Sequence, residues 1–234
     1  MPGRSRPGTS HGRDRGQHFL TSAALAARLV ADAGILPTDH VVEFGAGTGT
    51  LTAALVDRGA RVFAIEIDAS LAVGLVHRFS EVRAVAVFEC DGLEFPLPST
   101  PYRVVANPPF NRTSAILHKL LDHPGGSLVR ADLVVQWQVA RDLAQAHDKM
   151  SIDLVAASWV PWWTFRRARR LPAKLFRPPP SVDAAVLSIT RRDPELLPKE
   201  LVTLFRQFLR AHFAASPRAD ADYWVDRFQA TLRA

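Results

Sequence analysis

The chain has 234 residues, of which 47% are hydrophobic, and it carries a formal net charge of +6 with a pI near 10.2. Such a chain can bury one sizeable core plus a small appendage, and its basic balance suits a polyanionic partner. The single cysteine excludes a disulfide framework and a cysteine-rich zinc site, and no helix-spaced histidine pair flanks an acid, so we expect no metal. Since no apolar run has the length of a membrane span or a signal-peptide core, we expect a cytoplasmic protein.

The beginning of the chain is polar and basic. Four arginines stand there among Pro, Gly and Ser, namely Arg4, Arg6, Arg13 and Arg15. This composition is too polar to fold alone, and it predicts a flexible arm over residues 1–15 that contacts phosphates. A tail without function is the alternative. A helix is predicted next, over residues 23–33, with Thr21 or Ser22 as its N-cap.

An apolar run that ends in an acid and a glycine-spaced turn follows at Val41–Thr52, VVEFGAGTGTLT. Glycine allows positive φ and a close approach of the backbone to a ligand. The G-x-G-x-G spacing departs from the G-x-G-x-x-G of dinucleotide sites, which place a pyrophosphate on a helix N-terminus. S-adenosylmethionine carries a sulfonium cation and no phosphate, so its pocket needs a close backbone and an acidic lining. We therefore predict that Glu43, Gly45 and Gly47 contribute to such a pocket; an ordinary strand-to-helix loop is the alternative.

Two further predicted strands also end in acids. RVFAIEID at Arg61–Asp68 places Glu66 seventeen residues after Gly49, the distance that one helix and one strand consume. Its carboxylate can accept hydrogen bonds from both ribose hydroxyls. AVAVFECD at Ala84–Asp91 ends in Asp91, which can bind the exocyclic amine of the cofactor's adenine. A solvated acid at a strand end is the alternative for each residue taken singly, but three acid-tipped strands in succession favour one pocket.

The next predicted strand, Tyr102–Ala106, leads into a turn with the sequence NPPF. Pro108 and Pro109 fix φ and lack N–H groups, so the turn presents carbonyl oxygens without competing donors. The amino group of a base is a poor nucleophile because its lone pair is delocalised into the ring. Acceptors from the Asn107 side chain and the Pro108 carbonyl would hold its two hydrogens while Phe110 stacks on the base, so that positioning and electrostatics promote catalysis. A loop plug is the alternative.

The segment Trp159–Arg177, WVPWWTFRRARRLPAKLFR, interleaves aromatic rings with cations and contains no acid. Cations for the backbone and rings for unpaired bases are what single-stranded or loop RNA binding requires. We therefore predict RNA contacts from four of its arginines, Arg166, Arg167, Arg169 and Arg170. For the tryptophans at 159, 162 and 163, the alternative is that they finish a core strand.

Along the chain, strands alternate with helices, which predicts a mainly parallel α/β sheet with helices on both faces. Strands are expected near residues 41–44, 61–66, 84–89, 102–106, 132–137, 154–163 and 183–190. Helical stretches are expected near residues 49–58, 69–79, 113–121 and 138–147. The last two strands lie close together with the arginine-rich segment as the loop between them. They are therefore predicted to form an antiparallel hairpin at the edge of a seven-stranded sheet.

The tail beyond residue 192 has helical periodicity. Its apolar residues at this spacing are Leu201, Leu204, Phe205, Phe208 and Leu209, followed by Tyr223, Trp224 and Phe228. We therefore predict a small helical lobe over residues 193–234, behind a catalytic domain over residues 16–192.

Six motifs occur in the order seen in the ribosomal RNA adenine N6-methyltransferases: RGQHFL (Arg15–Leu20), EFGAGTG, IEID, CDG (Cys90–Gly92), ANPPFNRTS and FRPPPSV (Phe176–Val182). The chain resembles this family over about residues 13 to 190, and most of all the erythromycin-resistance (Erm) methylases of actinobacterial type, whose relatives methylate small-subunit rRNA. The resemblance implies a Rossmann-like class I S-adenosylmethionine-dependent methyltransferase. It also implies methyl transfer to the N6 of one adenine in 23S rRNA, giving resistance to macrolide, lincosamide and streptogramin B antibiotics.

The resemblance further implies roles for individual residues. The implied cofactor contacts are His18 and Leu20 at the methionine end, Gly45 through its backbone, Glu66 at the ribose, Asp91 at the adenine, and Asn107 between cofactor and target. Phe110 and Phe176 would grip the flipped base. The implied partner is 23S rRNA before ribosome assembly is complete, and we expect the protein to act as a monomer.

Two departures from the family pattern bear on the substrate. His18 stands where the family usually has Asn, and a histidine keeps hydrogen-bonding ability at this position. Pro108 stands where the family mostly has Ile or Leu, a pattern also common among DNA adenine methyltransferases. The alternatives are thus a DNA adenine N6-methyltransferase, a small-subunit rRNA adenine dimethyltransferase and a non-catalytic RNA-binding relative. The last would be expected to lack Asn107 or the glycine turn, and the number of methyl groups added stays open.

Overall fold

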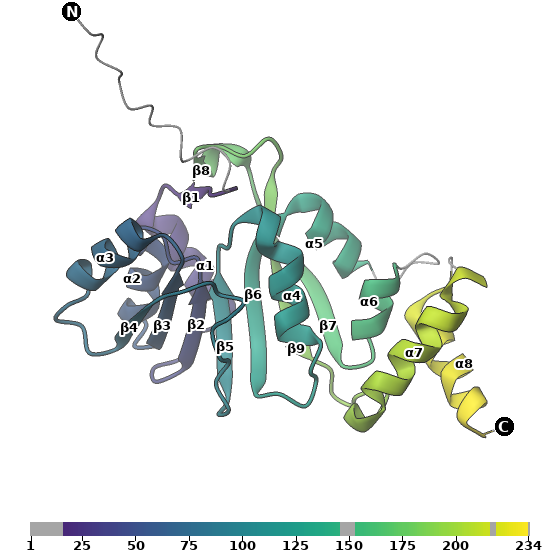
Figure 1. The fold of residues 1–234 in the computed structure, drawn as a ribbon. Coiled ribbons are helices and arrows are strands. Elements are labelled where there is room, and N and C mark those ends of the chain that lie inside the picture. Colours follow the sequence, from purple (N-terminus) through teal and green to yellow (C-terminus); the bar gives the residue numbers. More distant parts are fainter. Residues whose placement is uncertain (1–15, 146–152, 216–218, 234) are drawn as a thin grey trace, which may run out of the picture.

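A seven-stranded sheet forms the centre of the computed structural model, which describes residues 16–145, 153–215 and 219–233 (Figure 1). The strand order is β4-β3-β2-β5-β6-β9-β7. These strands are β2 (His40–Phe44), β3 (Arg61–Glu66), β4 (Val85–Glu89), β5 (Tyr102–Ala106), β6 (Leu128–Gln136), β7 (Trp163–Leu171) and β9 (Ala184–Arg191). The strands β2 to β6 pair in parallel, whereas β9 pairs antiparallel with both β6 and β7. The predicted mainly parallel sheet with an antiparallel edge hairpin is therefore confirmed. The predicted basic arm, residues 1–15, lies outside the described residues.

Helices cover both faces of the sheet because strand side chains alternate between two apolar layers. Val41 belongs to one apolar cluster, while Val42 and Phe44 belong to the other. The first face is covered by α1 (Ala23–Ala33), α2 (Thr50–Asp57) and α3 (Ala69–Arg78), and the second by α4 (Thr113–Leu121), α5 (Trp137–Ala144) and α6 (Leu154–Trp159). Short 3₁₀ helices connect elements at Phe110–Arg112, Ala173–Leu175, Lys199–Leu201 and Phe213–Ala215.

The strand predicted over residues 154–163 is wrong, because α6 occupies its first part. The Asp153 carboxylate accepts a hydrogen bond from the Ala156 N–H, which is an N-cap and starts a helix. Pro161 follows α6 and has no N–H to donate to a strand ladder. The edge strand β7 therefore begins only at Trp163 and runs through the four arginines. These arginines lie on a strand of the hairpin and not in the loop between its strands.

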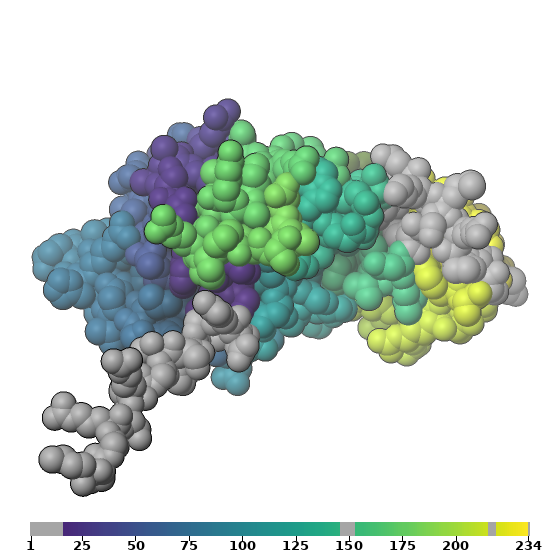
Figure 2. Space-filling model, turned by 90° about the horizontal axis from the view of Figure 1, so that it is seen from above, coloured from purple at the N-terminus to yellow at the C-terminus, as the bar shows by residue number. Residues whose placement is uncertain are grey.

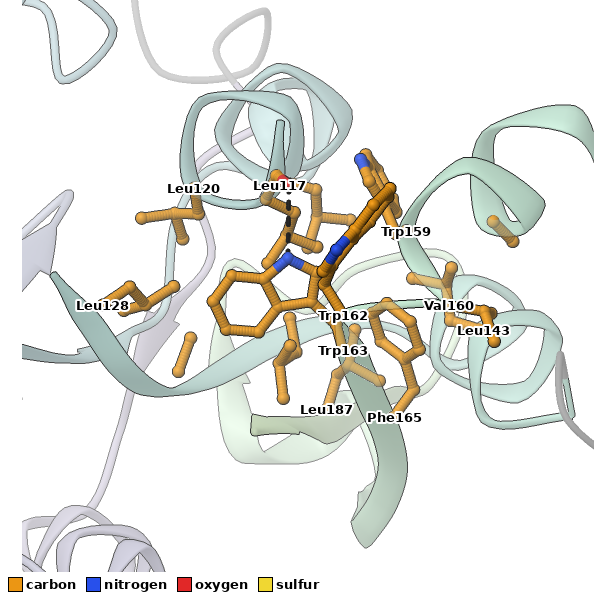
Figure 3. Close-up of a cluster of buried hydrophobic side chains, with 14 of the residues drawn as sticks. Leu117, Leu120, Leu128, Leu143, Trp159, Val160, Trp162, Trp163, Phe165 and Leu187 are labelled. Atoms are coloured by element: carbon orange, nitrogen blue, oxygen red, sulfur yellow. Dashed lines mark hydrogen bonds between the residues drawn. The ribbon is translucent and has the colours of Figure 1, made fainter. Parts of the chain in front are cut away.

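Three tryptophans around the start of β7, Trp159, Trp162 and Trp163, form what we call the tryptophan cluster (Figure 3). Each residue is at most 2% exposed. Each Nε1–H donates to an acceptor within 3.2 Å, which is the carboxylate of Asp122 for Trp159 and a backbone carbonyl for the other two. Figure 3 shows these rings enclosed by leucine, valine and phenylalanine side chains. The cluster therefore belongs to the core, and its rings are closed to RNA bases.

The predicted helical lobe consists of α7 (Val202–His212) and α8 (Ala221–Arg233). The buried residues of both helices belong to the same apolar cluster as the tryptophan cluster. The rings of Trp162 and Phe205 meet edge to face, with centroids 6.0 Å apart. The core of the lobe is thus continuous with the layer on the second face of the sheet. The domain boundary at residues 192 and 193 remains a prediction.

A second, two-stranded sheet joins β1 (Phe19–Leu20) to β8 (Phe176–Arg177) in antiparallel pairing. It lies at the edge formed by the carboxyl ends of β2 to β6, which we call the carboxyl edge, at the top of Figure 1. Asn107, directly after β5, donates a hydrogen bond to the His18 carbonyl beside β1. The sequence pattern did not predict this sheet, because strands of two residues carry no periodicity.

Candidate active site

The glycine turn after β2 approaches two other segments closely. Gly45 and Gly47 have φ values of +71° and +56°. A Cβ atom at Gly45 would stand 3.2 Å from the Pro109 ring, and one at Gly47 would stand 2.8 Å from the Phe19 ring. Only glycine combines these backbone angles with this proximity. The turn therefore brings β1 and the NPPF segment against the end of β2.

Glu66, at the end of β3, is buried and holds the glycine turn in place. Its Oε2 atom accepts a hydrogen bond from the Gly47 N–H at 2.8 Å, and its Oε1 atom accepts one from the Asp68 N–H at 2.9 Å. A carboxylate offers about four lone-pair sites, so acceptor capacity for two hydroxyl groups remains. Glu66 thus combines a structural role in the turn with free acceptor capacity.

Glu43 lies beneath the turn. Its side chain is buried, and its Oε2 atom accepts a hydrogen bond from the Thr52 hydroxyl at 2.7 Å. Burial raises the pKa of Glu43 to about 8, against the lowering effect of the Thr52 hydrogen bond and with a further rise from the charge of Glu66. At neutral pH this carboxyl is mainly protonated. Glu43 therefore links β2 to α2 under the turn and adds little negative charge.

Asp91 follows β4, and both of its carboxylate oxygens already have partners. Oδ1 accepts a hydrogen bond from the Leu93 N–H at 2.9 Å, and Oδ2 is paired with the Arg112 guanidinium. Arg112 comes from the short 3₁₀ helix that follows the NPPF turn. An amine donor that reaches Asp91 must share the carboxylate with Arg112 or displace it.

Asn107 stands at the end of β5, and only the nitrogen of its side-chain amide has a hydrogen-bond partner among the described residues. Its Nδ2 atom donates to the His18 carbonyl at 2.7 Å, which fixes the orientation of the amide. Its Oδ1 atom is buried and has no hydrogen-bond partner among the described residues. Buried acceptors are usually paired, so this oxygen is a vacant acceptor at the carboxyl edge. Pro108, the next residue, is buried and has no N–H to fill it.

Aromatic rings gather beside Asn107. Phe110 is half-buried, and its ring centroid lies 5.2 Å from that of His18 and 6.3 Å from that of Phe176. The His18 Nδ1 atom donates to the Pro178 carbonyl at 2.8 Å, which ties β1 to the segment after β8. Phe176 is buried in a small apolar cluster that also contains Leu20. Phe110 therefore has the more accessible of the two predicted base-binding rings.

Two hollows open along this edge and share the residues Gly45, Glu66 and Pro109. The first is lined also by Phe44, Ile65, Ile67, Cys90, Asp91, Gly92, Leu93, Arg112 and Ile116. The second is lined also by Gln17, His18, Phe19 and Asn107. The arrangement suits an elongated ligand with one end at Asp91 and the other at His18. Of the predicted cofactor residues it brings together His18, Gly45, Glu66, Asp91 and Asn107, whereas Leu20, Glu43 and Gly47 line neither hollow.

Comparison with known proteins places this geometry in a family. A family profile described as "Ribosomal RNA adenine dimethylase" matches residues 9–219. The chain belongs to the ribosomal RNA adenine dimethylase family. It is 36% identical over 209 residues to an rRNA adenine N-6-methyltransferase of Corynebacterium diphtheriae, which covers 89% of this chain and 80% of that protein. It is also 32% identical over 201 residues to ribosomal RNA small subunit methyltransferase A of Syntrophotalea carbinolica, covering 85% of this chain and 76% of that one.

Among solved structures, the crystal structure of the 23S rRNA methyltransferase ErmE matches with a TM-score of 0.74 and 29% identity, covering 84% of this chain and 79% of that one. These comparisons confirm the predicted family, its Rossmann-like methyltransferase fold and the predicted enzyme class, an rRNA adenine N6-methyltransferase. The matched proteins include one named for 23S rRNA and one named for the RNA of the small ribosomal subunit.

The four arginines predicted to contact RNA lie outside both hollows, on β7. Arg166 and Arg167 are exposed. Arg169 is paired with Asp32 of α1 at 2.6 Å, and Arg170 is paired with Asp183 at 2.7 Å. The strand thus divides the set into arginines with and without an acidic partner, a division that the sequence pattern did not show.

Sequence reasoning missed several residues that line the hollows. Pro109 lines both hollows, and Phe19 packs under the glycine turn, yet neither was assigned to the site. Arg112, which follows the NPPF turn, was missed as well, because no local pattern indicates its pairing with Asp91, 21 positions earlier in the chain. For Phe19 the sequence offered no signal beyond its place in the first motif.

Two expectations concern metal sites and membrane-spanning helices. In the part of the chain that the structure describes, no three His, Cys, Asp or Glu side chains gather in a way that could hold a metal ion. Within the same ranges, no helix combines the length and the apolarity needed to cross a bilayer.

Proposed function

We propose that this member of the family transfers a methyl group from S-adenosylmethionine to the N6 atom of one adenine in 23S rRNA. The overall likeness to ErmE, which is named as a 23S rRNA methyltransferase, supports the choice of 23S rRNA as the substrate. The residues that the fold gathers at the carboxyl edge support the chemistry. We further propose that the protein acts as a monomer in the cytoplasm, on rRNA that is not yet fully assembled into a ribosomal subunit.

The vacant Oδ1 acceptor of Asn107 is the observation that carries the proposal. The Nδ2 atom is engaged with the His18 carbonyl, so the oxygen is the group that the amide presents to a ligand. An exocyclic amine has two hydrogens and a lone pair delocalised into its ring. The Asn107 oxygen and the Pro108 carbonyl would accept those hydrogens, which localises the lone pair on nitrogen and makes it nucleophilic.

The residues around the two hollows fit S-adenosylmethionine. Glu66 retains acceptor capacity for ribose hydroxyls, and the adenine amine would share the Asp91 carboxylate with Arg112 or displace Arg112 from it. Gly45 leaves no room for a side chain beside Pro109, so its backbone is what a ligand would meet there. His18 would meet the methionine end, and Leu20, which lines neither hollow, would act there from the adjacent strand β1. When bound, this cofactor supplies an electrophilic methyl group on its sulfonium.

The target adenine would enter beside the aromatic rings. Phe110 is half-buried next to Asn107, so it would stack on the base, while the buried Phe176 supports Phe110 through an edge-to-face contact. A base reaches such a pocket only after it has swung out of its stack. Exposed arginines on β7, together with residues 1–15 of the chain, would bind the phosphate backbone around it.

Three alternatives define what the test must separate. A small-subunit rRNA adenine dimethyltransferase is supported by the 32% identity to methyltransferase A. A DNA adenine N6-methyltransferase is favoured only by Pro108. A non-catalytic RNA-binding relative would be expected to lack the Asn107 acceptor, which this chain retains.

The test is transfer of a tritiated methyl group onto protein-free 23S rRNA, 16S rRNA and duplex DNA in parallel, followed by nucleoside analysis. We expect label in N6-methylated adenosine from 23S rRNA. Label confined to 16S rRNA or to DNA would contradict the substrate assignment, and no label on any of the three would contradict the activity itself. Expression in a sensitive bacterium should raise the inhibitory concentration of a macrolide, a lincosamide and a streptogramin B together, because all three would be excluded by one modified adenine.

A further inference from the structure

Two arginines of β7 converge on one tryptophan outside the candidate active site. The Arg167 and Arg170 guanidinium carbons lie 4.1 and 5.0 Å from the centroid of the Trp137 ring. Trp137 is the first residue of α5 and is half-buried against the apolar layer below. Both distances are within the range of cation–π attraction. We call these three residues the Arg-Trp-Arg group.

A β-bulge in the edge strand creates this group. Residues three apart on a regular strand point to opposite faces of the sheet. Here Arg167 pairs with Leu187 and Arg169 pairs with Val186, so Ala168 is skipped in the register. The extra residue reverses the alternation, which puts Arg167 and Arg170 on the face of α5. Arg169 is thereby turned to the opposite face, where it meets Asp32 of α1.

The group carries uncompensated positive charge. Arg170 donates to Asp183 through Nε at 2.9 Å and through a terminal nitrogen at 2.7 Å. Asp183 also accepts from the Ala173 N–H at 3.0 Å, and this hydrogen bond, followed by that of Arg170, lowers the pKa of Asp183. Arg167 has no carboxylate partner among the described residues. Asp183 therefore compensates Arg170, and the uncompensated charge of the group belongs to Arg167, which is exposed and could attract an anion.

The Arg-Trp-Arg group lies at the carboxyl edge, the same edge of the sheet as the pocket proposed for the target base. Trp137 directly follows β6, so it stands at the carboxyl edge. Because β6 and β7 both pair antiparallel with β9, β7 also ends at this edge, and Phe176 of β8 follows five residues after its last residue. Figure 2, which looks down on this edge, shows the green segment after β7 between the purple N-terminal segment and the teal segment that contains α5.

We propose that the Arg-Trp-Arg group is a phosphate-binding contact that holds the RNA strand next to the flipped adenine. The proposal rests on the proposed function and names a contact within it. The Trp137 ring positions the two guanidinium groups by cation–π contact and does not stack on a base, because the two guanidinium groups already lie against the ring. The guanidinium fork of Arg167 matches two phosphate oxygens, and the indole limits the orientations that this fork explores before binding, while Arg170 stays bound to Asp183.

The first test measures RNA affinity across a series of salt concentrations for the full-length protein and its Arg167→Gln variant, using a 23S rRNA fragment that the unaltered protein methylates. We expect about five- to tenfold weaker binding at moderate salt and a salt slope reduced by about one, because one phosphate contact is lost. The matched control is Arg61→Gln, which removes an exposed arginine at the amino end of β3, on the opposite edge of the sheet. We expect this control to keep the original slope.

A second variant, Trp137→Leu, keeps both charges and removes the aromatic support. We expect about two- to threefold weaker RNA binding with nearly the original salt slope, since the count of cations is unchanged. Cofactor affinity by calorimetry should stay the same in both variants. Equal salt slopes for Arg167→Gln and Arg61→Gln would overturn the inference while methylation by the unaltered protein still supports the proposed function. Absence of methylation of any 23S rRNA fragment by the unaltered protein would instead overturn the proposed function.

Discussion

The tryptophan cluster and the carboxyl edge differ in whether their polar groups have partners within the protein. In the cluster, every indole N–H has an acceptor and every ring is buried. At the carboxyl edge, the Oδ1 atom of Asn107 is buried without a partner, and Arg167 has no acid among the described residues. In the tryptophan cluster, which serves only the fold, each polar group has a hydrogen-bond partner within the protein. At the carboxyl edge, some polar groups lack a partner and are available to a ligand.

A missing partner alone does not mark a site. The Nε1 atom of Trp224 in the C-terminal lobe is also buried and has no hydrogen-bond partner in the part of the chain that the structure describes. Asn107 differs because it lines a hollow and its amide is oriented by the His18 carbonyl. The contrast therefore depends on the surroundings of the vacant group, and it can be tested on each side separately.

The largest effect is expected for Trp163→Ala, within the tryptophan cluster. The substitution empties a volume that is completely buried and removes the donor to the Leu121 carbonyl, so we expect about 3–5 kcal/mol lower unfolding free energy in urea. Trp163→Phe keeps most of the apolar volume and should cost about 1–3 kcal/mol, chiefly for the unpaired carbonyl. Leu36→Ala is the control, because this leucine is 62% exposed. Equal stability of the three variants would show that the cluster does not support the fold.

The next effect is expected at Asn107, and it should appear in activity instead of stability. Asn107→Ala removes the vacant acceptor, and we expect the rate of methyl transfer to fall about 10²- to 10³-fold, as for the loss of one preorganised polar contact to a transition state. Cofactor binding should remain measurable by calorimetry. The unfolding free energy should fall by only about 1 kcal/mol, for the bond to the His18 carbonyl. Unchanged turnover would remove the proposed acceptor role.

The acid-tipped strands were predictable from the sequence because each signal is local. Glu66, Asp91 and Asn107 each end a run of strand residues, and parallel strands bring their carboxyl ends to one edge. The pairing of β1 with β8 was not predictable, since it joins segments about 160 residues apart through contacts such as that of His18 with Pro178. No periodicity in either segment encodes that contact.

The errors have the same origin. The range predicted as a strand, residues 154–163, contains two valines and three tryptophans, which suit strands, and the decisive signal for a helix was the single N-cap Asp153. The two sides of β7 depend on a bulge at Ala168, which a sequence pattern with a period of two residues cannot show. Arginines that look equivalent in the sequence are therefore divided between two faces of the sheet.

Glu66→Gln tests whether the Glu66 carboxylate binds the cofactor as well as the glycine turn. The two backbone N–H groups that donate hydrogen bonds to Glu66 would compete for the single amide oxygen, and one charged acceptor for the ribose would be lost. We expect about 10- to 100-fold weaker cofactor binding by calorimetry, the range for a hydrogen bond to a charged group. Glu89→Gln is the matched control, because Glu89 ends β4 directly opposite Glu66 but is exposed and lines neither hollow. Similar losses in both variants would contradict a specific role for Glu66.

The smallest effect is expected at Glu43. This carboxyl group lies beside the site and already has a hydrogen-bond partner, the Thr52 hydroxyl. Its pKa is raised from 4.5 to about 8 by burial, so between these values the unfolded chain has released a proton that the folded chain retains. The unfolding free energy should therefore fall as the pH rises through this window, by at most about 1.4 kcal/mol per pH unit. Glu43→Gln lacks this proton, so its stability relative to the unaltered protein should rise steadily between pH about 5.5 and 7.5.

Thr52→Val separates burial from hydrogen bonding as the cause of that slope. Its hydroxyl donates to Glu43 and lowers the pKa, so removing it should move the upper end of the sloping window to higher pH while leaving the lower end unchanged. Urea unfolding at a series of pH values measures both ends. If Glu43→Gln kept the same pH slope as the unaltered protein, Glu43 would be ionised in the folded chain, and the buried acid would belong with the unsatisfied groups of the carboxyl edge.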